Sequence, residues 1–455
     1  MLWLNVVSRR DRLYDAEESS VVVTMATLAL GVSSLALLIW IGMLLFWGQF
    51  WRADQRLNPD ALLPLTAWPA VAVVIPARNE ADLIGVAVRS HLSQTYPGPL
   101  SVVLVDDQST DGTAAVAKES ARAINQGDRL TVLSGTALPR GWAGKLWAME
   151  QGYRYLLSLP TSPDYVLFTD ADIEHDADSL RQLVMKAESE QLDLVSLMVQ
   201  LRCETAWEQL LIPAFVFFFQ MLYPFPWVND PNNRTAAAAG GCILLRRTAL
   251  ERIGGLAVLR NALIDDCSLA AAVKRPHSAA APLAHPAGTH PYPSQEGIPG
   301  PKSSPSPHPP ISPFPYHPIW LGLSTTIHSL RPYPDFHSIW TMITRSAYTQ
   351  LNYSPWLLAG TVLGMALVYL VAPLGLVLGI VWGNPILALT GLAGWLLMAL
   401  AYWPTLRLYG GNPLLALALP VIALLYTLMT LDSARRHWAG QGGAWKGRVY
   451  SDMGG

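Results

Sequence analysis

An Asp-x-Asp element, Thr169-Asp170-Ala171-Asp172, follows the short apolar segment that ends at Thr169. In an extended chain, side chains at positions i and i+2 point to the same face, so both carboxylates can bind one divalent cation. Acidic pairs are common in exposed loops, and the spacing alone is therefore weak evidence for a metal site. Its position at the end of an expected strand predicts that Asp170 and Asp172 bind Mg²⁺ or Mn²⁺.

Further acidic residues follow two other apolar segments. Asp106 and Asp107 directly follow the apolar segment Val102 to Val105, and Glu80 comes shortly after the apolar segment Val71 to Pro76. At such a strand end a carboxylate can accept hydrogen bonds from a base or a ribose, which makes these residues candidates for a nucleoside pocket. The alternative for the residues after Asp106 is an Asx-type turn that only caps the next helix.

Lys145 ends the string Gly141-Trp142-Ala143-Gly144-Lys145. The two glycines permit the close approach of a phosphate, and the ammonium can balance the charge of a diphosphate. The string is not a Walker loop, because the required spacing and the terminal Ser or Thr are missing. A solvated lysine without a ligand is the alternative.

Asp265 and Asp266 follow the apolar residues Ala262 to Ile264 and precede an expected helix. A carboxylate in a desolvated cleft can act as a general base on an acceptor hydroxyl. Aspartates also favour the first turn of a helix, so an ordinary helix cap explains the pair equally well. The residues alone leave both interpretations open.

The elements that must position these side chains alternate between strand and helix from residue 70 to 275. Apolar runs predict strands at 71–76, 100–105, 130–133 and 165–169, with helical patterns between them. Such alternation predicts a mostly parallel sheet with helices on both faces. Ligands of such a sheet bind at the carboxyl ends of its strands, where the acidic residues fall.

With 51% hydrophobic and 14% charged residues, the chain is too apolar for an ordinary soluble protein. Met25 to Trp47 is long enough to cross a bilayer and predicts a membrane anchor after a polar extension, residues 1–24. Residues 356–431 contain three further candidate spans, which are Trp356 to Val381, Pro385 to Trp403 and Pro413 to Leu431. The net charge of −2 gives no reason to expect binding to nucleic acid.

Four remaining segments complete the predicted organisation. The Phe-rich residues 209–228 predict a helix in the membrane surface, with a full span as the alternative. Residues 276–318 are rich in Pro, His and Ser and predict a disordered insertion. Residues 319–355 are expected to end the catalytic region with an interfacial helix, and residues 432–455 to form a basic tail. Three full C-terminal crossings would separate this tail from the domain, so one span is expected to be irregular, most simply 356–381 around Pro373.

From Ala72 to about Lys274, the order of these motifs resembles the family 2 glycosyltransferases, enzymes with a GT-A fold. The resemblance implies a nucleotide-sugar donor and a divalent metal ion. It also implies a role for each acidic motif: Asp106, with Asp107, would bind the nucleotide base, Asp170 and Asp172 the metal, and Asp266, beside Asp265, would be the catalytic base.

Several strings look like the hopene-associated glycosyltransferases, membrane proteins linked to hopanoid lipid biosynthesis. They are Leu197 to Glu204, Phe215 to Pro224, Ala236 to Cys242, Leu263 to Asp266, Leu330 to Pro334 and Arg345 to Leu351. This resemblance implies a lipid acceptor, with a hopanoid expected, and a multi-pass protein of the cell inner membrane whose catalytic domain is cytoplasmic.

Two departures from the related patterns matter. The Pro-rich insertion separates Asp266 from Ile319-Trp320-Leu321, and the Gln-x-x-Arg-Trp string of processive synthases is missing. Polymerisation is therefore not expected. A polyprenyl-phosphate or carotenoid glycosyltransferase could use the same motifs, and a non-catalytic lipid-binding membrane scaffold is an alternative of a different class.

Overall fold

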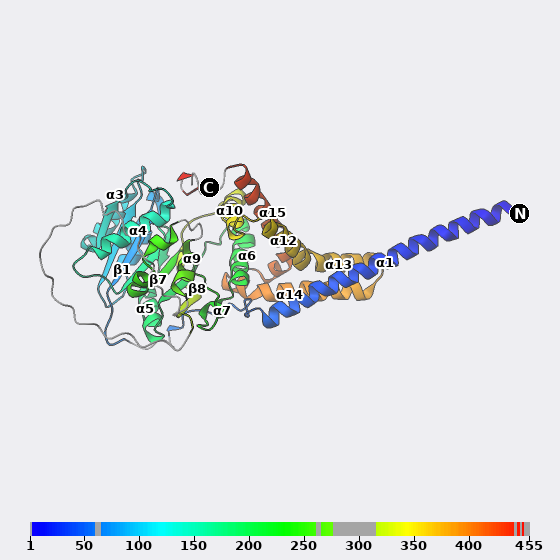
Figure 1. The fold of residues 1–455 in the computed structure, drawn as a ribbon, viewed down its shortest axis with the longest axis horizontal. Helices are drawn as coiled ribbons and strands as arrows, with labels where there is room; N and C mark the ends of the chain where they lie inside the picture. The colour runs from blue at the N-terminus through cyan, green and yellow to red at the C-terminus, as the bar shows by residue number, and fades with distance from the viewer. Residues whose placement is uncertain are drawn as a thin grey trace, which may run out of the picture.

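The structure is a computed structural model that describes residues 2–59, 65–260, 265–275, 315–440, 444–445 and 448–449. For residues 2–22, Asp265 and the segments from 444 onward, it describes only the backbone. Figure 1 shows a sheet domain at one end and long helices at the other. Most of the predicted insertion, residues 276–314, lies outside the described part of the chain.

The sheet domain is built on eight strands in the order β3-β2-β1-β4-β7-β6-β8-β5. Strands β1, β2, β3 and β4 are parallel to their neighbours within this group, and β6 is parallel to β8. Strand β7 runs antiparallel to β4 and β6, and β5 runs antiparallel to β8. The bounds are β1 (Val71–Ala77), β2 (Leu100–Asp106), β3 (Leu130–Ser134), β4 (Tyr165–Thr169), β5 (Ile173–His175), β6 (Leu194–Gln200), β7 (Cys242–Arg246) and β8 (Ile319–Ser329).

Both faces of this sheet are covered by helices, because the strands are apolar on both sides. In β1, Val71, Val73 and Ile75 belong to one buried cluster, whereas Ala72 and Val74 belong to the other. This alternation follows from the two-residue period of a strand. One face carries α2 (Ala81–Leu92), α3 (Thr113–Ala123) and α5 (Ser179–Ser189), and the other carries α4 (Gly144–Leu157), α8 (Arg247–Arg252) and α9 (Asp265–Val273). The predicted α/β fold class is confirmed.

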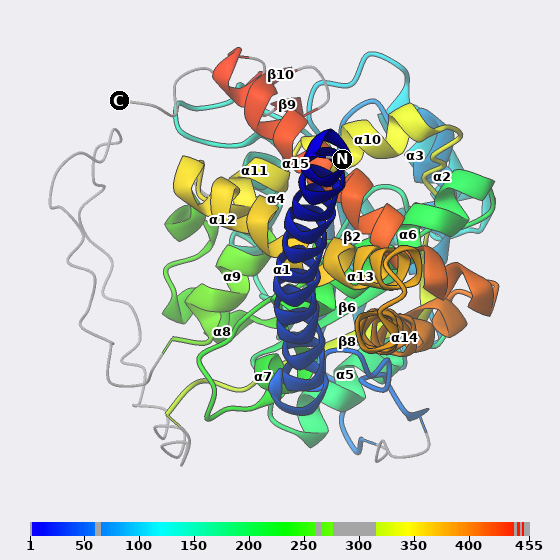
Figure 2. The same ribbon diagram turned by 90° about the vertical axis from the view of Figure 1, so that its right-hand side faces the viewer.

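The second part consists of long apolar helices, namely α1 (Leu2–Phe46), α12 (Pro355–Met365), α13 (Val371–Val381), α14 (Pro385–Leu408) and α15 (Leu419–Trp438). Four segments are long and apolar enough to cross a membrane: Val23–Phe46, Pro355–Val381, Pro385–Leu408 and Pro413–Trp438. The predicted apolar helices at both ends of the chain are thus present. Figure 2 looks along α1, which contacts both α13 and α14.

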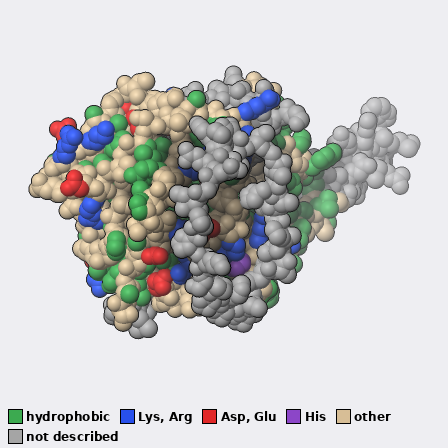
Figure 3. All heavy atoms as spheres, turned by 60° about the vertical axis from the view of Figure 1, so that its left-hand side comes forward, with side chains coloured by type: hydrophobic (Ala, Val, Ile, Leu, Met, Phe, Trp, Pro, Cys, Tyr) green, Lys and Arg blue, Asp and Glu red, His purple; other side chains and the backbone are tan. Residues whose placement is uncertain are grey.

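Glycines let α13 and α14 pack with their backbones close together. A Cβ on Gly379 would collide with the backbone of Ala388, and one on Gly391 would collide with the backbone of Leu376. Small residues at such crossings are typical of helices that associate within a membrane. Figure 3 shows charged side chains over the sheet domain and hydrophobic ones where the described helices come into view.

The Phe-rich segment forms α6 (Ala206–Leu222), which lies between the sheet domain and the long helices. Phe217 is fully buried, and Gln220 donates to the Thr405 hydroxyl of α14 at 3.2 Å. Only the ends of the helix carry large exposed apolar side chains, with Trp207 at 42% and Leu222 at 59% exposure. The helix therefore joins the two parts, and its predicted position in the membrane surface stays a prediction.

Both ends of the last apolar segment lie on the side of the sheet domain. Just before it, the Tyr409 hydroxyl accepts a hydrogen bond from the backbone of Leu201. The 3-10 helix η6 (Pro413–Ala418) then runs beside α14, where Trp395 Nε1 donates to Leu417 O. Helix α15 returns, and Trp340 of α10 (Phe336–Thr344) donates to Asp432.

Residues 413–438 therefore enter the helical part and turn back, which keeps Arg435 and Arg436 near the sheet domain. Residues 356–381, which we expected to hold the irregular span, contain a π-helical turn at Ala366–Leu370 but continue away from the domain. Their irregularity is local, because one π turn adds a residue without reversing the helix.

This arrangement predicts the outcome of a labelling experiment on the full chain in cells. A cysteine at Gly440 and one at Glu190, on the sheet domain, should react with a membrane-impermeant maleimide from the same side. A cysteine at Gly383, between α13 and α14, should react from the opposite side. Reaction of the Gly383 and Gly440 positions from one side would contradict the return of residues 413–438.

Candidate active site

Strands β1, β2 and β4 run parallel and bring their following acidic residues to one edge of the sheet. Asp106 ends β2, and its Oδ1 accepts a hydrogen bond from the Ser109 backbone at 2.9 Å. Asp107 is fully buried, and its Oδ2 lies 3.7 Å from Arg78 Nη1. Asp111 Oδ1 accepts from Thr113 N at 3.0 Å, so the Asx-type turn that was one alternative is present before α3. Asp106 is the less buried carboxylate of the Asp106–Asp107 pair.

The Asp-x-Asp pair is in contact with two basic side chains. Lys145, in the first turn of α4, places its Nζ 2.5 Å from Asp170 Oδ1. Arg331, which follows β8, donates from Nε to Asp172 Oδ2 at 2.7 Å. Its Nη2 donates to Glu80 Oε1, also at 2.7 Å. The four predicted site residues Glu80, Lys145, Asp170 and Asp172 are therefore all ion-paired, in two groups: Lys145 with Asp170, and Arg331 with Glu80 and Asp172.

Arg331 was not among the predicted site residues. The string Leu330-Arg331-Pro332-Tyr333-Pro334 was quoted only as part of a family resemblance. None of its other residues is charged, so the string by itself assigns no ligand or ion-pair partner to the arginine. Its distance of 159 residues from Asp172 hides the contact in the sequence. The available signal was an arginine two residues after the end of β8.

The Asp-x-Asp pair fits a divalent cation whose other ligands come from a substrate. Within the described residues no group of three or more His, Cys, Asp or Glu could hold a metal ion. Mg²⁺ is commonly bound through one or two carboxylates together with substrate phosphates. The basic partners of both carboxylates show that this position favours positive charge. Asp170 and Asp172 are the residues that would hold such an ion.

Asp266 lies in the first turn of α9 and points toward the same region. Its Oδ2 accepts from the Gly240 backbone at 3.0 Å, and its Oδ1 accepts from Cys267 N at 2.7 Å. A Cβ on Gly240 would lie 3.3 Å from Lys145 Nζ and 3.4 Å from Asp266 Oδ2. Lys145 and Asp266 therefore both reach the space beside Gly240. The side chain of Asp265 lies outside the described residues.

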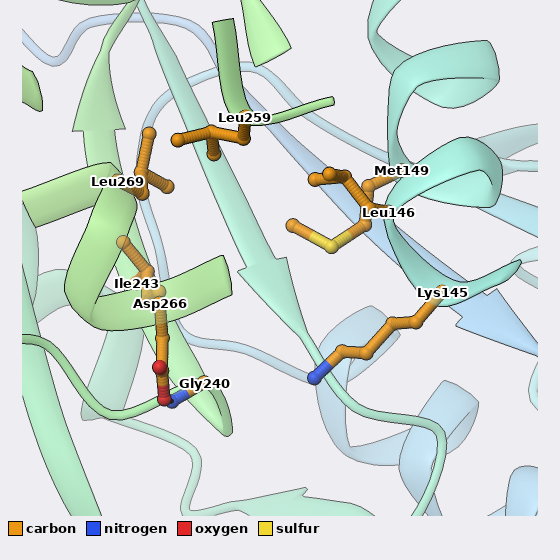
Figure 4. A pocket seen from close by; sticks show the side chains of 8 residues that line it. All are labelled: Lys145, Leu146, Met149, Gly240, Ile243, Leu259, Asp266 and Leu269. Carbon is orange, nitrogen blue, oxygen red and sulfur yellow. Dashed lines mark hydrogen bonds between the residues drawn. The ribbon is translucent and has the colours of Figure 1, made fainter. Parts of the chain in front are cut away.

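A small pocket opens between Lys145 and Asp266, and Figure 4 shows these two side chains at one end of it. The rest of its lining is apolar, apart from the Gly240 backbone, and consists of Leu146, Met149, Ile243, Leu259 and Leu269. An apolar wall reduces the hydration of a nearby carboxylate and ammonium, which strengthens their interactions with a ligand. The pocket thus joins a carboxylate, an ammonium group and an apolar surface.

Lys274 holds α9 in place from its far end. The side chain is only 2% exposed, and its Nζ donates to four backbone carbonyls, those of Trp227, Val228, Asp230 and Thr235. These carbonyls belong to α7 (Phe225–Asn229) and the loop that leads to Gly240. A buried ammonium with this many acceptors fixes the helix that carries Asp266 to the loop that carries Gly240.

Two buried histidines lie beneath the Asp-x-Asp turn. His175 in β5 packs on His91 of α2, with ring centroids 4.3 Å apart, and its Nε2 lies 3.4 Å from the Thr169 hydroxyl. Burial lowers the pKa of His91 to about 3. Burial, and then the neighbouring His91, lower the pKa of His175 well below its usual value. Both rings are therefore neutral at pH 7.

The neutral histidine pair predicts a loss of stability in acid. Unfolded His91 takes up a proton near pH 6.5, but the folded protein resists this down to about pH 3. The stability is therefore complete above pH 6.5 and falls as the pH decreases toward 3, by about 2 kcal/mol at pH 5 for His91. Thermal midpoints of the purified protein between pH 7 and 5 measure this effect. His91→Phe should flatten the profile, and an unchanged profile would contradict the assignment.

Comparisons with known proteins relate the sheet domain to glycosyltransferases. Residues 72–254 match the model of the family described as Glycosyl transferase family 2. The 4,4'-diaponeurosporenoate glycosyltransferase of Staphylococcus haemolyticus is 30% identical over 105 residues, which are 23% of this chain and 24% of that protein. Glycosyltransferase AglE of Haloferax volcanii is 33% identical over 91 residues, 20% of this chain and 29% of that protein. The chain thus spans only 24% and 29% of the length of these two curated relatives.

Among solved structures, the chain is similar to the mannosyltransferase PcManGT from Pyrobaculum calidifontis, described in complex with GDP-Man and Mn²⁺. The identity is 18% and the TM-score 0.48, with 90% of this chain and 99% of that chain covered.

Proposed function

Residues 72–254 form a family 2 glycosyltransferase domain, and from this premise we propose the activity of the whole chain. It is a membrane-bound, inverting glycosyltransferase that moves a sugar from a nucleotide-sugar donor to a lipid acceptor. The observation that carries this proposal is that Lys145 and Asp266 both reach the space beside Gly240, with Lys145 paired to Asp170. A donor-binding cation and a potential base thereby meet at one point.

In this proposal each residue of the acidic edge has a defined part. Asp106, with Asp107 and Glu80 nearby, binds the nucleoside, and Lys145 binds the diphosphate. Asp170 and Asp172 hold a divalent cation, Mg²⁺ or Mn²⁺, which supplies charge neutralisation for the leaving diphosphate. The glycosidic oxygen of the donor leaves with the nucleoside diphosphate as its bond to the anomeric carbon breaks.

Asp266 takes the proton of the acceptor hydroxyl while that oxygen attacks the anomeric carbon from the opposite face. Its carboxylate is oriented by the backbone N–H groups of Gly240 and Cys267. Lys145 also reaches the space beside Gly240, so the proposed base and the diphosphate-binding cation can act on the same bound donor.

The proposed acceptor is a lipid because the site lies in a domain joined by α6 to apolar helices. A hopanoid is the proposed acceptor on the strength of the strings quoted above, and the domain would face the cytoplasm at the inner membrane. A carotenoid is the second candidate, favoured by the likeness of one segment to a diaponeurosporenoate glycosyltransferase. Polyprenyl phosphate is a third.

A direct assay tests the proposal. The purified full-length protein is incubated with Mg²⁺ or Mn²⁺, a panel of UDP- and GDP-sugars, and a hopanoid polyol, a carotenoid acid or a polyprenyl phosphate. We expect a glycolipid with inverted anomeric configuration from one donor and one acceptor class. If every pair gives no product and calorimetry detects no metal-dependent binding of UDP or GDP, the chain is instead a non-catalytic scaffold.

A further inference from the structure

Arg331 connects two acidic residues that follow different strands. Its guanidinium donates from Nε to Asp172 and from Nη2 to Glu80, both at 2.7 Å. The Glu80 and Asp172 side chains are only 10% and 11% exposed, whereas that of Arg331 is 33% exposed. The Arg331 guanidinium therefore covers the Asp172 carboxylate, which the proposed function assigns to the metal ion. The guanidinium itself is partly open to solvent.

The backbone around Arg331 is held independently of this side chain. Leu330 N donates to the Asp172 carbonyl at 2.8 Å, and Tyr333 N donates to Glu208 Oε1 at 2.7 Å. Glu208 is itself fixed in the capping box at the start of α6. The guanidinium can therefore leave its carboxylates by rotation of its side chain, while the segment that carries it stays in place.

The charges of the site explain why such a movement would be needed. Lys145 and Arg331 together balance most of the charge of Glu80, Asp170 and Asp172. A divalent cation arriving alone would meet two positive groups already bound to its ligands, which disfavours its binding. A nucleoside diphosphate brings negative oxygens that a guanidinium can bind with two parallel hydrogen bonds.

We propose that Arg331 is an internal counter-cation of the donor site. It neutralises Glu80 and Asp172 before the donor arrives, and it moves to the donor's diphosphate when a divalent cation binds at Asp172. The metal ion and the nucleotide then bind together, and neither binds well alone. This inference rests on the proposed function. It adds Arg331 to the donor site and couples the binding of the metal ion to the binding of the nucleotide.

The test measures binding of Mn²⁺ to the purified full-length protein by the electron paramagnetic resonance signal of free Mn²⁺, with and without UDP or GDP. The wild-type protein should bind Mn²⁺ weakly alone and at least tenfold more tightly with the nucleotide. Arg331→Met should bind Mn²⁺ alone about tenfold more tightly, because a like charge is removed. It should also lose most of the enhancement by the nucleotide.

Two further variants separate this role from a structural one. Arg331→Lys keeps the charge, so it should bind Mn²⁺ alone like the wild type. Arg246→Met removes an arginine that is paired with Glu188 at 3.1 Å, away from the Asp-x-Asp pair, and should change neither measurement. Equal thermal midpoints for wild type and Arg331→Met would show that the variant is folded.

The possible failures are distinguishable. If the wild type shows the coupling of Mn²⁺ and nucleotide but Arg331→Met shows the same coupling, the inference about Arg331 is wrong and the proposed function stands. If the wild type binds Mn²⁺ equally well with and without nucleotide, the exchange is also excluded. If it binds neither UDP nor GDP at any Mn²⁺ concentration, the proposed function fails first.

Discussion

Asp266→Asn is expected to lower kcat for sugar transfer by about 10³-fold, within the range that a general base contributes. The amide keeps the shape of the side chain, but its single oxygen can accept from only one of the Gly240 and Cys267 backbone groups. Lys274 still ties the end of α9 to the backbone carbonyls of Val228 and Thr235, so the helix should stay in place, and equal thermal midpoints of variant and wild type would show this. It cannot take up a proton from the acceptor. Because Asp266 is assigned to the acceptor and not to the donor, the affinity for UDP or GDP should stay within about twofold of wild type.

The measurement is the initial rate of glycolipid formation at saturating donor, combined with calorimetry of nucleotide binding. Asp128→Asn is a matched control, since Asp128 is exposed in the short η2 turn (Gly127–Arg129) away from this edge. A rate for Asp266→Asn within tenfold of the control would exclude Asp266 as the base. If Asp266→Asn also lost the binding of UDP or GDP, Asp266 would belong to the donor site instead of the acceptor site.

Asp170→Asn is expected to lower kcat/KM by about 10² to 10³-fold, the usual effect of removing one electrostatic contact to developing charge. The substitution removes a carboxylate assigned to the divalent cation and, at the same time, the partner of Lys145. Unlike Asp266→Asn, it should also weaken the binding of the nucleotide in the presence of Mn²⁺. The rate should recover in part as the Mn²⁺ concentration is raised, because the remaining ligand still binds the ion.

Rates measured over a series of Mn²⁺ concentrations test this expectation. Glu119→Gln, on the exposed surface of α3, provides the control for loss of one acidic charge. If Asp170→Asn needed no more Mn²⁺ than the control, its carboxylate would not be a metal ligand. The two aspartate variants together would thus divide the site into a donor side and an acceptor side.

Much of this arrangement was predictable from short stretches of sequence. Strands such as Val71–Ala77 are buried on both faces and are consequently apolar along their whole length. Asp106 ends β2 and Asp170 follows β4. These strands lie parallel on either side of β1, so the meeting of the two aspartates at one edge follows from the fold class. The apolar helices were equally evident, since a span needs a long run of apolar residues.

The contacts that complete the site were not predictable in the same way. The interaction of Arg331 with Asp172 and Glu80 depends on β8 lying beside β6 and β5, which no local pattern specifies. The sequence left a helix cap and a catalytic base as equal alternatives for Asp266, and neither alternative predicts its contact with the backbone of Gly240, 26 residues away. Nor does the sequence indicate that Lys145 is paired with Asp170.

The sequence by itself determined the α/β domain, the acidic residues at its strand ends and the apolar helices on either side of it. These features depend on the period of a strand, the length of a span and the residue types that each environment accepts, all of which are local. Only the tertiary structure decided which cation meets which carboxylate, that α6 is buried between the two parts, and that residues 413–438 turn back toward the sheet domain. Each of these depends on contacts between segments that are distant in the chain. The residue pattern of a short segment does not specify which distant segment it will contact.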